Sequence, residues 1–160
     1  MLETLDAAAL EETRQQHIGR LLVQSTRAFN VRALGKLQRL GHTKLGMAHL
    51  NVLPCLDVQG TRIVTLAQRA GMTKQAAGQL VAELEHWGYV ERLPDPQDRR
   101  AVLIGFTASG WAYLQQAQQI KREIEKEYQA VLGEAGWADL QQSLRTLLAW
   151  EGEQDQDAVR

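Results

Sequence analysis

The sequence predicts a mainly α-helical protein that carries one β-hairpin. Apolar residues recur at three- and four-residue steps over most of the 160 residues, as they do on the buried face of a helix. Near residues 89–106 the pattern changes, because the runs YVERL and AVLIGF alternate like two strands around a charged tip, PDPQDRR. Two short helical stretches, separated by a glycine-containing turn, come just before this hairpin.

Length and composition indicate a single globular domain. The chain is 44% hydrophobic and 23% charged, which is ordinary for a globular protein, and we expect a single domain over residues 1–150 with a flexible acidic tail at 151–160. No apolar run approaches the roughly 20 residues that cross a bilayer. The acidic start, MLETLDAAALEETRQQ, lacks the pattern of a secretory signal, and there is one cysteine. We therefore expect a cytoplasmic protein with no membrane partner and no disulfide.

The net charge of −1 conceals a segregation of charge along the chain. No acidic residue lies between Glu12 and Asp57, a stretch that holds seven lysines and arginines, whereas acids outnumber bases after Lys121. A positive middle section is typical of proteins with a polyanionic partner. The alternative at this stage is a set of solvated helix surfaces that happen to be basic.

The first two helices follow from the apolar spacing. One is expected from about residue 7 to 40, which is too long for a small domain to cover, so a second copy of the chain is the simplest cover. The break at GHT ends it, and Thr43 is expected to cap a second helix that reaches about Val58. Pro54 lies inside this second pattern and should kink the helix or force a local adjustment.

A helix-turn-helix unit is predicted next. Thr65 and Gln68 have the spacing of a capping box and should begin a short helix that ends at Ala70 and Gly71. Thr73 should cap the following helix, which ends at Gly88. In such a unit the second helix can lie in the major groove of DNA.

The second helix of this unit has two faces. The residues expected to pack inward, at steps of three and four, are Ala76, Leu80, Val81, Leu84 and Trp87. The residues that would then face out near its start are Lys74, Gln75, Gly78 and Gln79, with the small Ala77 beside them. Lysine suits phosphate or guanine, glutamine can bond adenine, and small residues permit close approach to a groove. Thr73 and the positive helix end add an anion-binding start.

The hairpin has the character of a wing. Its tip is stiffened by prolines and carries adjacent arginines, whereas a purely structural hairpin more often closes with a short Asn-Gly or Asp-Gly turn. Arginine is favoured in a narrow minor groove, where the negative potential is concentrated. After the hairpin Thr107 should cap a long helix over about 108–132, and the sequence GEAG separates it from a last helix over about 137–150.

Two stretches resemble the MarR-type winged helix-turn-helix transcriptional regulators. DRRAVLIGFT, Asp98 to Thr107, is similar to the wing pattern D-x-R-x-x-x-V-x-L-T of that family, with Ile104 and Phe106 as conservative changes. LVAELEHWGYVER, starting at Leu80, is similar to the end of its recognition helix and the glycine that leads into the wing. The resemblance covers essentially the whole chain. It implies a winged helix-turn-helix fold with a DNA-binding lobe at about 43–107 and dimerisation helices at about 7–40 and 108–150.

The resemblance also implies which residues contact DNA. The expected recognition-helix contacts are Thr73, Lys74, Gln75, Gly78 and Gln79, to which the residue pattern adds Ala77. In the wing, Arg100 would reach the minor groove with Arg99 beside it, and Asp98 would position the arginine. Gln79 stands where relatives often carry arginine, which leaves the sequence preference open.

The function implied is a sequence-specific transcriptional regulator that binds double-stranded DNA. It would act as a homodimer on a palindromic operator, as a repressor that responds to a small aromatic or phenolic effector. The alternative is a winged-helix dimer that binds proteins or sequesters small molecules and does not bind an operator. The lobe from Thr61 to Thr107 has six bases against five acids, which keeps this alternative open.

Other chemistry is not predicted. The sequence has no serine elbow, no phosphate-binding glycine loop and no H-E-x-x-H, so we expect no enzyme and no cofactor. The histidines lack metal-ligand spacing, and Cys55 lies within an apolar pattern, so we expect it to be a buried packing residue rather than a redox sensor. The tryptophans are expected in the core and the dimer interface, with stacking on an aromatic ligand as the alternative.

Overall fold

The computed structural model describes residues 17–98 and 100–158, and these form two compact units. One unit extends to Ile120 and the other begins at Lys121, and each is described here by itself. The expected first turns of a helix beginning near residue 7 lie outside the described residues. Within the described part, no helix has both the length and the apolar character needed to cross a membrane.

The first described helix, α2, runs over Ile18–Arg39. It begins after His17, whose Nδ1 accepts a hydrogen bond from the amide of Gly19 at 3.1 Å. It ends at the predicted break, where Gly41 has a φ of +103° that glycine adopts without strain. Ala33 and Leu37 are its buried residues, so only one stripe near its carboxyl end faces the core of this unit.

The next helical segment is shorter than the sequence predicts. Helix α3 covers Met47–Val52 and is followed by a 3₁₀ turn, η1, over Leu53–Cys55, so the expected local adjustment at Pro54 is confirmed. The predicted cap at Thr43 is wrong. The helix starts instead at Gly46, whose amide donates to Nδ1 of His49 at 3.0 Å.

The helix-turn-helix consists of α4 over Ile63–Arg69 and α5 over Lys74–His86. Helix α4 begins two residues before Thr65, so the predicted capping box is wrong; Arg62 precedes the helix and provides no side-chain cap. The turn after α4 is as predicted, and Gly71 adopts a φ of +62° within it. Strand β1 ends at Arg62 and α4 begins at the next residue, so the helix starts directly where the sheet ends.

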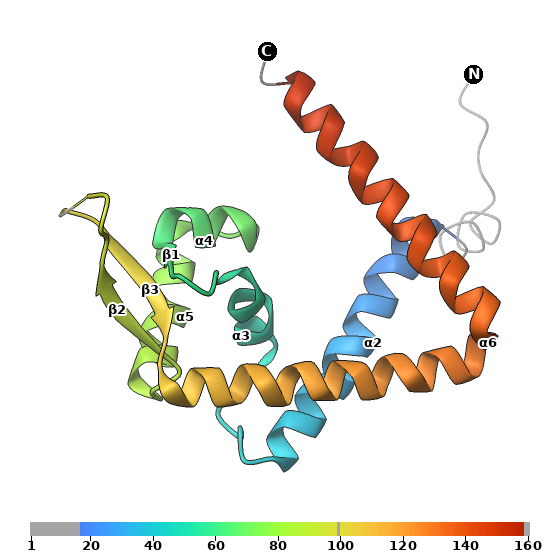
Figure 1. Ribbon diagram of the computed structural model, residues 1–160, viewed down its shortest axis with the longest axis horizontal. Coiled ribbons are helices and arrows are strands. Elements are labelled where there is room, and N and C mark those ends of the chain that lie inside the picture. Colours follow the sequence, from blue (N-terminus) through green and yellow to red (C-terminus); the bar gives the residue numbers. More distant parts are fainter. Residues whose placement is uncertain (1–16, 99, 159–160) are drawn as a thin grey trace, which may run out of the picture. The chain divides into compact units, whose positions relative to one another are not determined.

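The sheet has three antiparallel strands in the order β1-β3-β2. Strand β1 has only two residues, Thr61–Arg62, while β2 covers Val90–Pro94 and β3 covers Val102–Phe106. The hairpin register pairs Val90 with Phe106 and Arg92 with Ile104, which confirms the predicted hairpin. Figure 1 shows its tip extending beyond the helices of this lobe.

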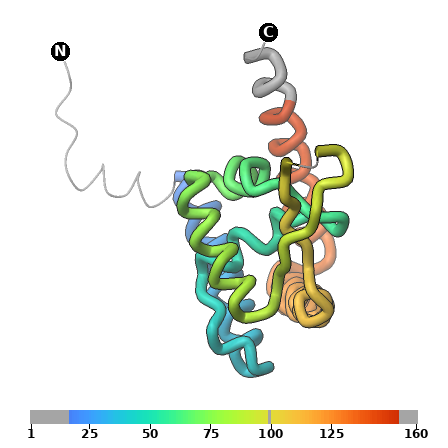
Figure 2. The backbone as a smooth tube through the Cα atoms, turned by 90° about the vertical axis from the view of Figure 1, so that its left-hand side faces the viewer, coloured from blue at the N-terminus to red at the C-terminus, as the bar shows by residue number. Residues whose placement is uncertain are grey.

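The core of the first unit lies between the sheet and helices α3, α4 and α5. Its fully or almost fully buried side chains include Leu45, Val52, Leu53, Leu66, Val81, Leu84, Val90 and Ile104. Helix α5 and the hairpin pack against each other and lie on the face turned to the viewer in Figure 2. This core places the second helix of the helix-turn-helix beside the hairpin.

The start of α6 is tied to the turn that follows α5. Thr107 caps α6 as predicted, because its Oγ1 accepts a hydrogen bond from the Gly110 amide at 3.0 Å. The same hydroxyl donates to the carbonyl of Gly88, and the amide of Thr107 donates to the carbonyl of Tyr89 at 3.2 Å. A side chain at position 110 would clash, since a Cβ there would lie 2.0 Å from the Tyr89 carbonyl oxygen.

Helix α6 runs over Ala108–Ala158 with one break at Gly133, where φ is +73° and ψ is 167°. The predicted interruption at GEAG is therefore confirmed at its first residue, but the helix resumes at residue 134 rather than 137. It also continues through residues 151–158, where we expected a flexible tail. In the second unit the leucines Leu140, Leu144, Leu147 and Leu148 are exposed.

Candidate nucleic-acid interface

Helix α5 begins with a well-formed cap on the side expected to meet DNA. The Thr73 hydroxyl accepts a hydrogen bond from the amide of Ala76 at 3.1 Å, and the backbone at Thr73 is extended. The remaining amides of the first turn point out of the helix end, where the helix dipole favours negative charge. No acidic side chain occupies this first turn. The helix start therefore suits a phosphate.

The buried face of α5 shares Val81 and Leu84 with the predicted face but contains Ala77 in place of Ala76. Ala77, Val81 and Leu84 are each 0% exposed, while Ala76 and Leu80 are only half-buried. Ala77 therefore belongs to the core and cannot contact a groove. Hydrophobicity could not show which of Ala76 and Ala77 is buried, because both are alanine. Only the packing of α5 against α3 and α4 decides which of them faces inward.

The other predicted recognition-helix residues lie at the surface. Thr73, Lys74, Gln75 and Gln79 are exposed, and Gly78 is half-buried. They occupy the N-cap and the first two turns of α5. Five of the six predicted positions are therefore at least partly accessible near the start of this helix.

The wing is anchored at its base by Asp95, a residue that the sequence analysis did not single out. Asp95 is 5% exposed, and its Oδ2 accepts hydrogen bonds from Nε and Nη2 of Arg62 at 2.7 and 2.6 Å. Its Oδ1 accepts from the amide of Gln97 at 2.8 Å. The Gln97 amide and the Arg62 guanidinium both favour the carboxylate, so they lower the pKa of Asp95. These contacts join the wing to β1.

The contact between Asp95 and the Gln97 amide could have been predicted from the sequence. An aspartate that bonds the amide two residues later forms an Asx turn, and Asp before Pro is a common way to begin one. The contact between Asp95 and Arg62 could not have been predicted, because Arg62 is 33 residues away and only the sheet brings it to Asp95.

At the tip, Asp98 holds the backbone of the wing. Its Oδ1 accepts a hydrogen bond from the amide of Arg100 at 3.0 Å. The resemblance implies that Asp98 positions an arginine, and in the structure Asp98 contacts the main chain of Arg100. The Arg100 side chain is exposed, and Arg99 lies outside the described residues.

Ion pairs decide where positive charge is available in this lobe. Arg62 pairs with Asp95, Arg69 with Asp57 at 2.8 Å, and Arg92 with Glu85 at 3.1 Å. Of the basic residues that the structure describes between positions 61 and 107, Lys74 and Arg100 are the two with no ion pair. Lys74 starts α5 and Arg100 lies in the wing. The described cations of this stretch that form no ion pair are therefore on the two elements expected to contact a nucleic acid.

Helix α5 is also held in place by the buried His49. The His49 ring is 7% exposed, and its Nε2 lies 2.9 Å from Oε2 of Glu83. The same ring packs edge-on against Trp87, with 4.9 Å between ring centroids. Because Nδ1 of His49 bonds the start of α3, this side chain links α3 to α5 and fixes the orientation of the helix.

A second histidine joins three segments near the end of α5. The ring nitrogens of His42 lie 2.7 Å from the Tyr89 hydroxyl and 2.6 Å from Oε1 of Gln116. Tyr113 packs edge-on against both rings, and its burial raises the pKa of its phenol to about 12. His42 and His49 are thus satisfied within the fold. The described residues include no group of three or more metal-ligating side chains.

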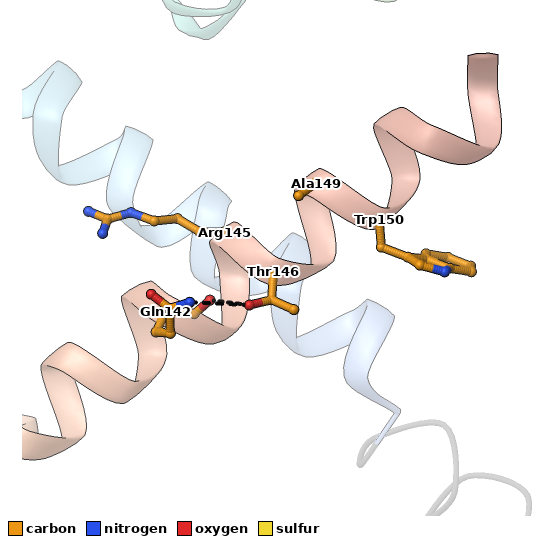
Figure 3. Close-up of a pocket in the computed structure, with 5 residues that line it drawn as sticks. All are labelled: Gln142, Arg145, Thr146, Ala149 and Trp150. Carbon is orange, nitrogen blue, oxygen red and sulfur yellow. Dashed lines mark hydrogen bonds between the residues drawn. The ribbon is translucent and has the colours of Figure 1, made fainter.

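Cys55 is half-buried rather than buried, and its thiol donates to the carbonyl of Asn51 at 3.3 Å. A hollow of about 470 Å³ lies along α6 and is lined by Gln142, Arg145, Thr146, Ala149 and Trp150. Figure 3 shows that these side chains come from one helix and that Arg145 and Trp150 point in opposite directions. Such a surface cannot enclose a ligand.

Two helices joined by a glycine turn, followed by an antiparallel hairpin with an arginine at its tip, define the winged helix-turn-helix class of DNA-binding proteins. Within this class, residues 48–101 match the model of the MarR family. In this segment and in its fold the chain is similar to MarR-family regulators, which are non-enzymatic.

Solved structures of transcriptional regulators have the same fold. A mutant of MarR from E. coli in complex with operator DNA is 25% identical, with a TM-score of 0.68 over 85% of this chain and 96% of that one. BldR from Sulfolobus solfataricus is 25% identical, with a TM-score of 0.62 over 91% and 99%. Tm0710 from Thermotoga maritima, at 22% identity, a TM-score of 0.58 and coverage of 89% and 96%, shows likeness of fold alone. No curated protein matches the chain.

Proposed function

We propose that this protein is a sequence-specific DNA-binding regulator that binds a palindromic operator as a homodimer in the cytoplasm. The observation that carries the proposal is the position of Lys74 and Arg100, the two described basic side chains between positions 61 and 107 that form no ion pair. They belong to α5 and the wing, which lie on one face of the first unit (Figure 2). In such an arrangement α5 enters a major groove and the wing follows the adjacent minor groove.

The low net charge of the lobe does not argue against DNA binding. Three of its arginines are held by Asp95, Asp57 and Glu85 and serve the fold, so a sum over residues hides where the unpaired charge lies. Attraction to phosphate depends on local potential rather than on the total. This distribution favours the regulator over a winged-helix module without DNA.

Salt dependence of binding tests the proposal. Duplex DNA selected from genomic fragments should bind the wild type with an affinity that falls steeply as salt rises, because counterions are released. Arg100→Ala should weaken binding and, if it removes one phosphate contact, reduce the logarithmic salt slope by about 1. Arg145→Ala is the matched control, since it removes the same charge from the exposed surface of α6.

The outcomes separate the two functions. Equal losses for Arg100→Ala and Arg145→Ala would show that only net charge matters and would refute the role of the wing. Failure of the wild type to bind any fragment, at low or high salt, would support the protein-binding or ligand-sequestering module instead. Sedimentation of the protein with and without DNA would test the dimer.

The finer proposal is that the regulator is a repressor released by a small aromatic acid. A hollow of about 360 Å³, within the size range of ligand pockets, lies between α2 and α3. Its lining combines apolar and polar residues with one arginine, namely Leu22, Val23, Thr26, Arg27, Asn30, Met47 and Asn51. An aromatic ring would contact the apolar side chains, and Arg27 would pair with a carboxylate.

Phenolic acids provide the test of this finer proposal. A binder should raise the melting temperature of the wild type, have a smaller effect on Arg27→Ala, and weaken operator binding of the wild type. A ligand shifts DNA binding only if it prefers one arrangement of the protein over the other. Stabilisation without any change in operator affinity would contradict its role as an effector.

A further inference from the structure

Gly78 lies in the interior of α5, where glycine is unfavourable. It is the fifth residue of a 13-residue helix, and glycine there is less stable than alanine by about 1 kcal/mol. Its backbone does not need glycine, because Gly78 is absent from the residues with positive φ. A helix keeps such a residue most readily where a side chain would obstruct something.

Nothing within the described protein is obstructed at this position. A Cβ built at Gly78 meets no heavy atom of the described residues within 4 Å. Gly105 and Gly110 differ, because a Cβ would lie 2.6 Å from Leu93 Cδ1 in the first case and 2.0 Å from the Tyr89 oxygen in the second. Packing within the protein therefore explains why glycine occupies positions 105 and 110, but it does not explain the glycine at position 78.

The neighbours of Gly78 indicate what approaches it. Gln75 lies three residues before it, Gln79 one after and Ala82 four after, and all three are exposed. Residues three and four apart are adjacent on a helix surface. Gly78 and Ala82 therefore form a shallow depression in the helix surface, which the amide side chains of Gln75 and Gln79 flank. Openness alone assigns no role, since Gly152 is equally open. Gly78 differs because two exposed glutamines, Gln75 and Gln79, border it near the start of α5.

We infer that Gly78 is the point at which the backbone of α5 meets the 5-methyl group of a thymine, in a half-site that Gln75 and Gln79 read at A·T pairs. The inference rests on the proposed function and specifies its DNA sequence class. Glutamine pairs with the N6 and N7 atoms of adenine, and thymine methyls contact small apolar surfaces. The exposed first two turns carry no arginine, the side chain that most often reads guanine.

Gly78→Ala tests the inference because it moves stability and binding in opposite directions. Alanine should raise the melting temperature by roughly 2–4 °C, since the helix gains propensity without a clash. Affinity for a duplex selected by the wild type from random DNA should fall by at least about tenfold, the loss typical of one mismatched base pair. Gly152→Ala is the matched control, since it fills an equally open helix position in the second unit and should leave DNA affinity unchanged.

Replacing thymine by deoxyuridine in the selected duplex identifies the contact. Uracil lacks the 5-methyl group, so it makes room for the alanine Cβ, and the loss caused by Gly78→Ala should shrink to about threefold or less. Gln75→Ala and Gln79→Ala should each relax the preference for A·T at one position of the half-site.

Three results would overturn the inference. They are unchanged affinity of Gly78→Ala, destabilisation by that substitution, and a loss that is equal on thymine and uracil duplexes. The failure of the proposed function looks different, because in that case the wild type selects no duplex at all. A half-site with G·C pairs at the positions relaxed by the glutamine substitutions would also exclude the A·T assignment.

Discussion

The Thr107 hydroxyl joins the DNA-binding lobe to the start of α6, and its removal should destabilise the fold by a predictable amount. Thr107→Val keeps the shape of the side chain but removes the oxygen that accepts from the Gly110 amide and donates to the Gly88 carbonyl. Loss of an N-cap costs about 1 kcal/mol, and loss of a partly buried hydrogen bond costs about 1 more. We therefore expect a decrease of about 2 kcal/mol in the free energy of unfolding.

Urea unfolding, followed by circular dichroism at one fixed protein concentration, measures this decrease. For a chain of this length about 2 kcal/mol corresponds to a fall of roughly 4–8 °C in melting temperature. Thr107→Ser retains the hydroxyl and serves as the matched control, so it should remain close to the wild type. If the valine and serine variants are equally stable, the hydroxyl contributes nothing and the reasoning from its two hydrogen bonds is refuted.

Two further predictions concern the wing and α5. The pKa of Asp95 is lowered in the folded protein by the Gln97 amide and by Arg62, so its contribution is present above the unfolded-state value and is lost as the pH falls through the folded value. Asp95→Asn should therefore flatten the acid limb of the stability curve, measured by unfolding at a series of pH values, and an unchanged acid limb would contradict the anchor. Ala77→Gln should destabilise the fold by at least about 1–3 kcal/mol because position 77 is fully buried, whereas Gln75→Ala should change it by less than about 0.5 kcal/mol. Thermal melts distinguish these two variants. If Ala77→Gln is as stable as the wild type, position 77 is exposed rather than buried.

The helix caps, the turn and the hairpin could be predicted from the sequence because each depends on residues close together in the chain. Thr73 and Thr107 cap helices since a hydroxyl reaches the amide three residues away, whatever the rest of the chain does. Gly71 marks the turn because it takes a left-handed backbone. Alternation around PDPQDRR indicated the hairpin for the same reason. The expected capping box at Thr65 was wrong because α4 begins directly after β1, whose pairing with β3 places the change from strand to helix between Arg62 and Ile63.

Tertiary structure alone decided which residues of the candidate interface are available. Ala76 and Ala77 are identical as residue types, and only the packing of α5 against neighbouring helices buries the second of them. The charge of the lobe was likewise ambiguous in the sequence, because the partners of Arg62, Arg69 and Arg92 lie 33, 12 and 7 residues away. Ion pairs across such separations form only when the chain is folded, and they leave Lys74 and Arg100 as the unpaired cations among the described residues between positions 61 and 107.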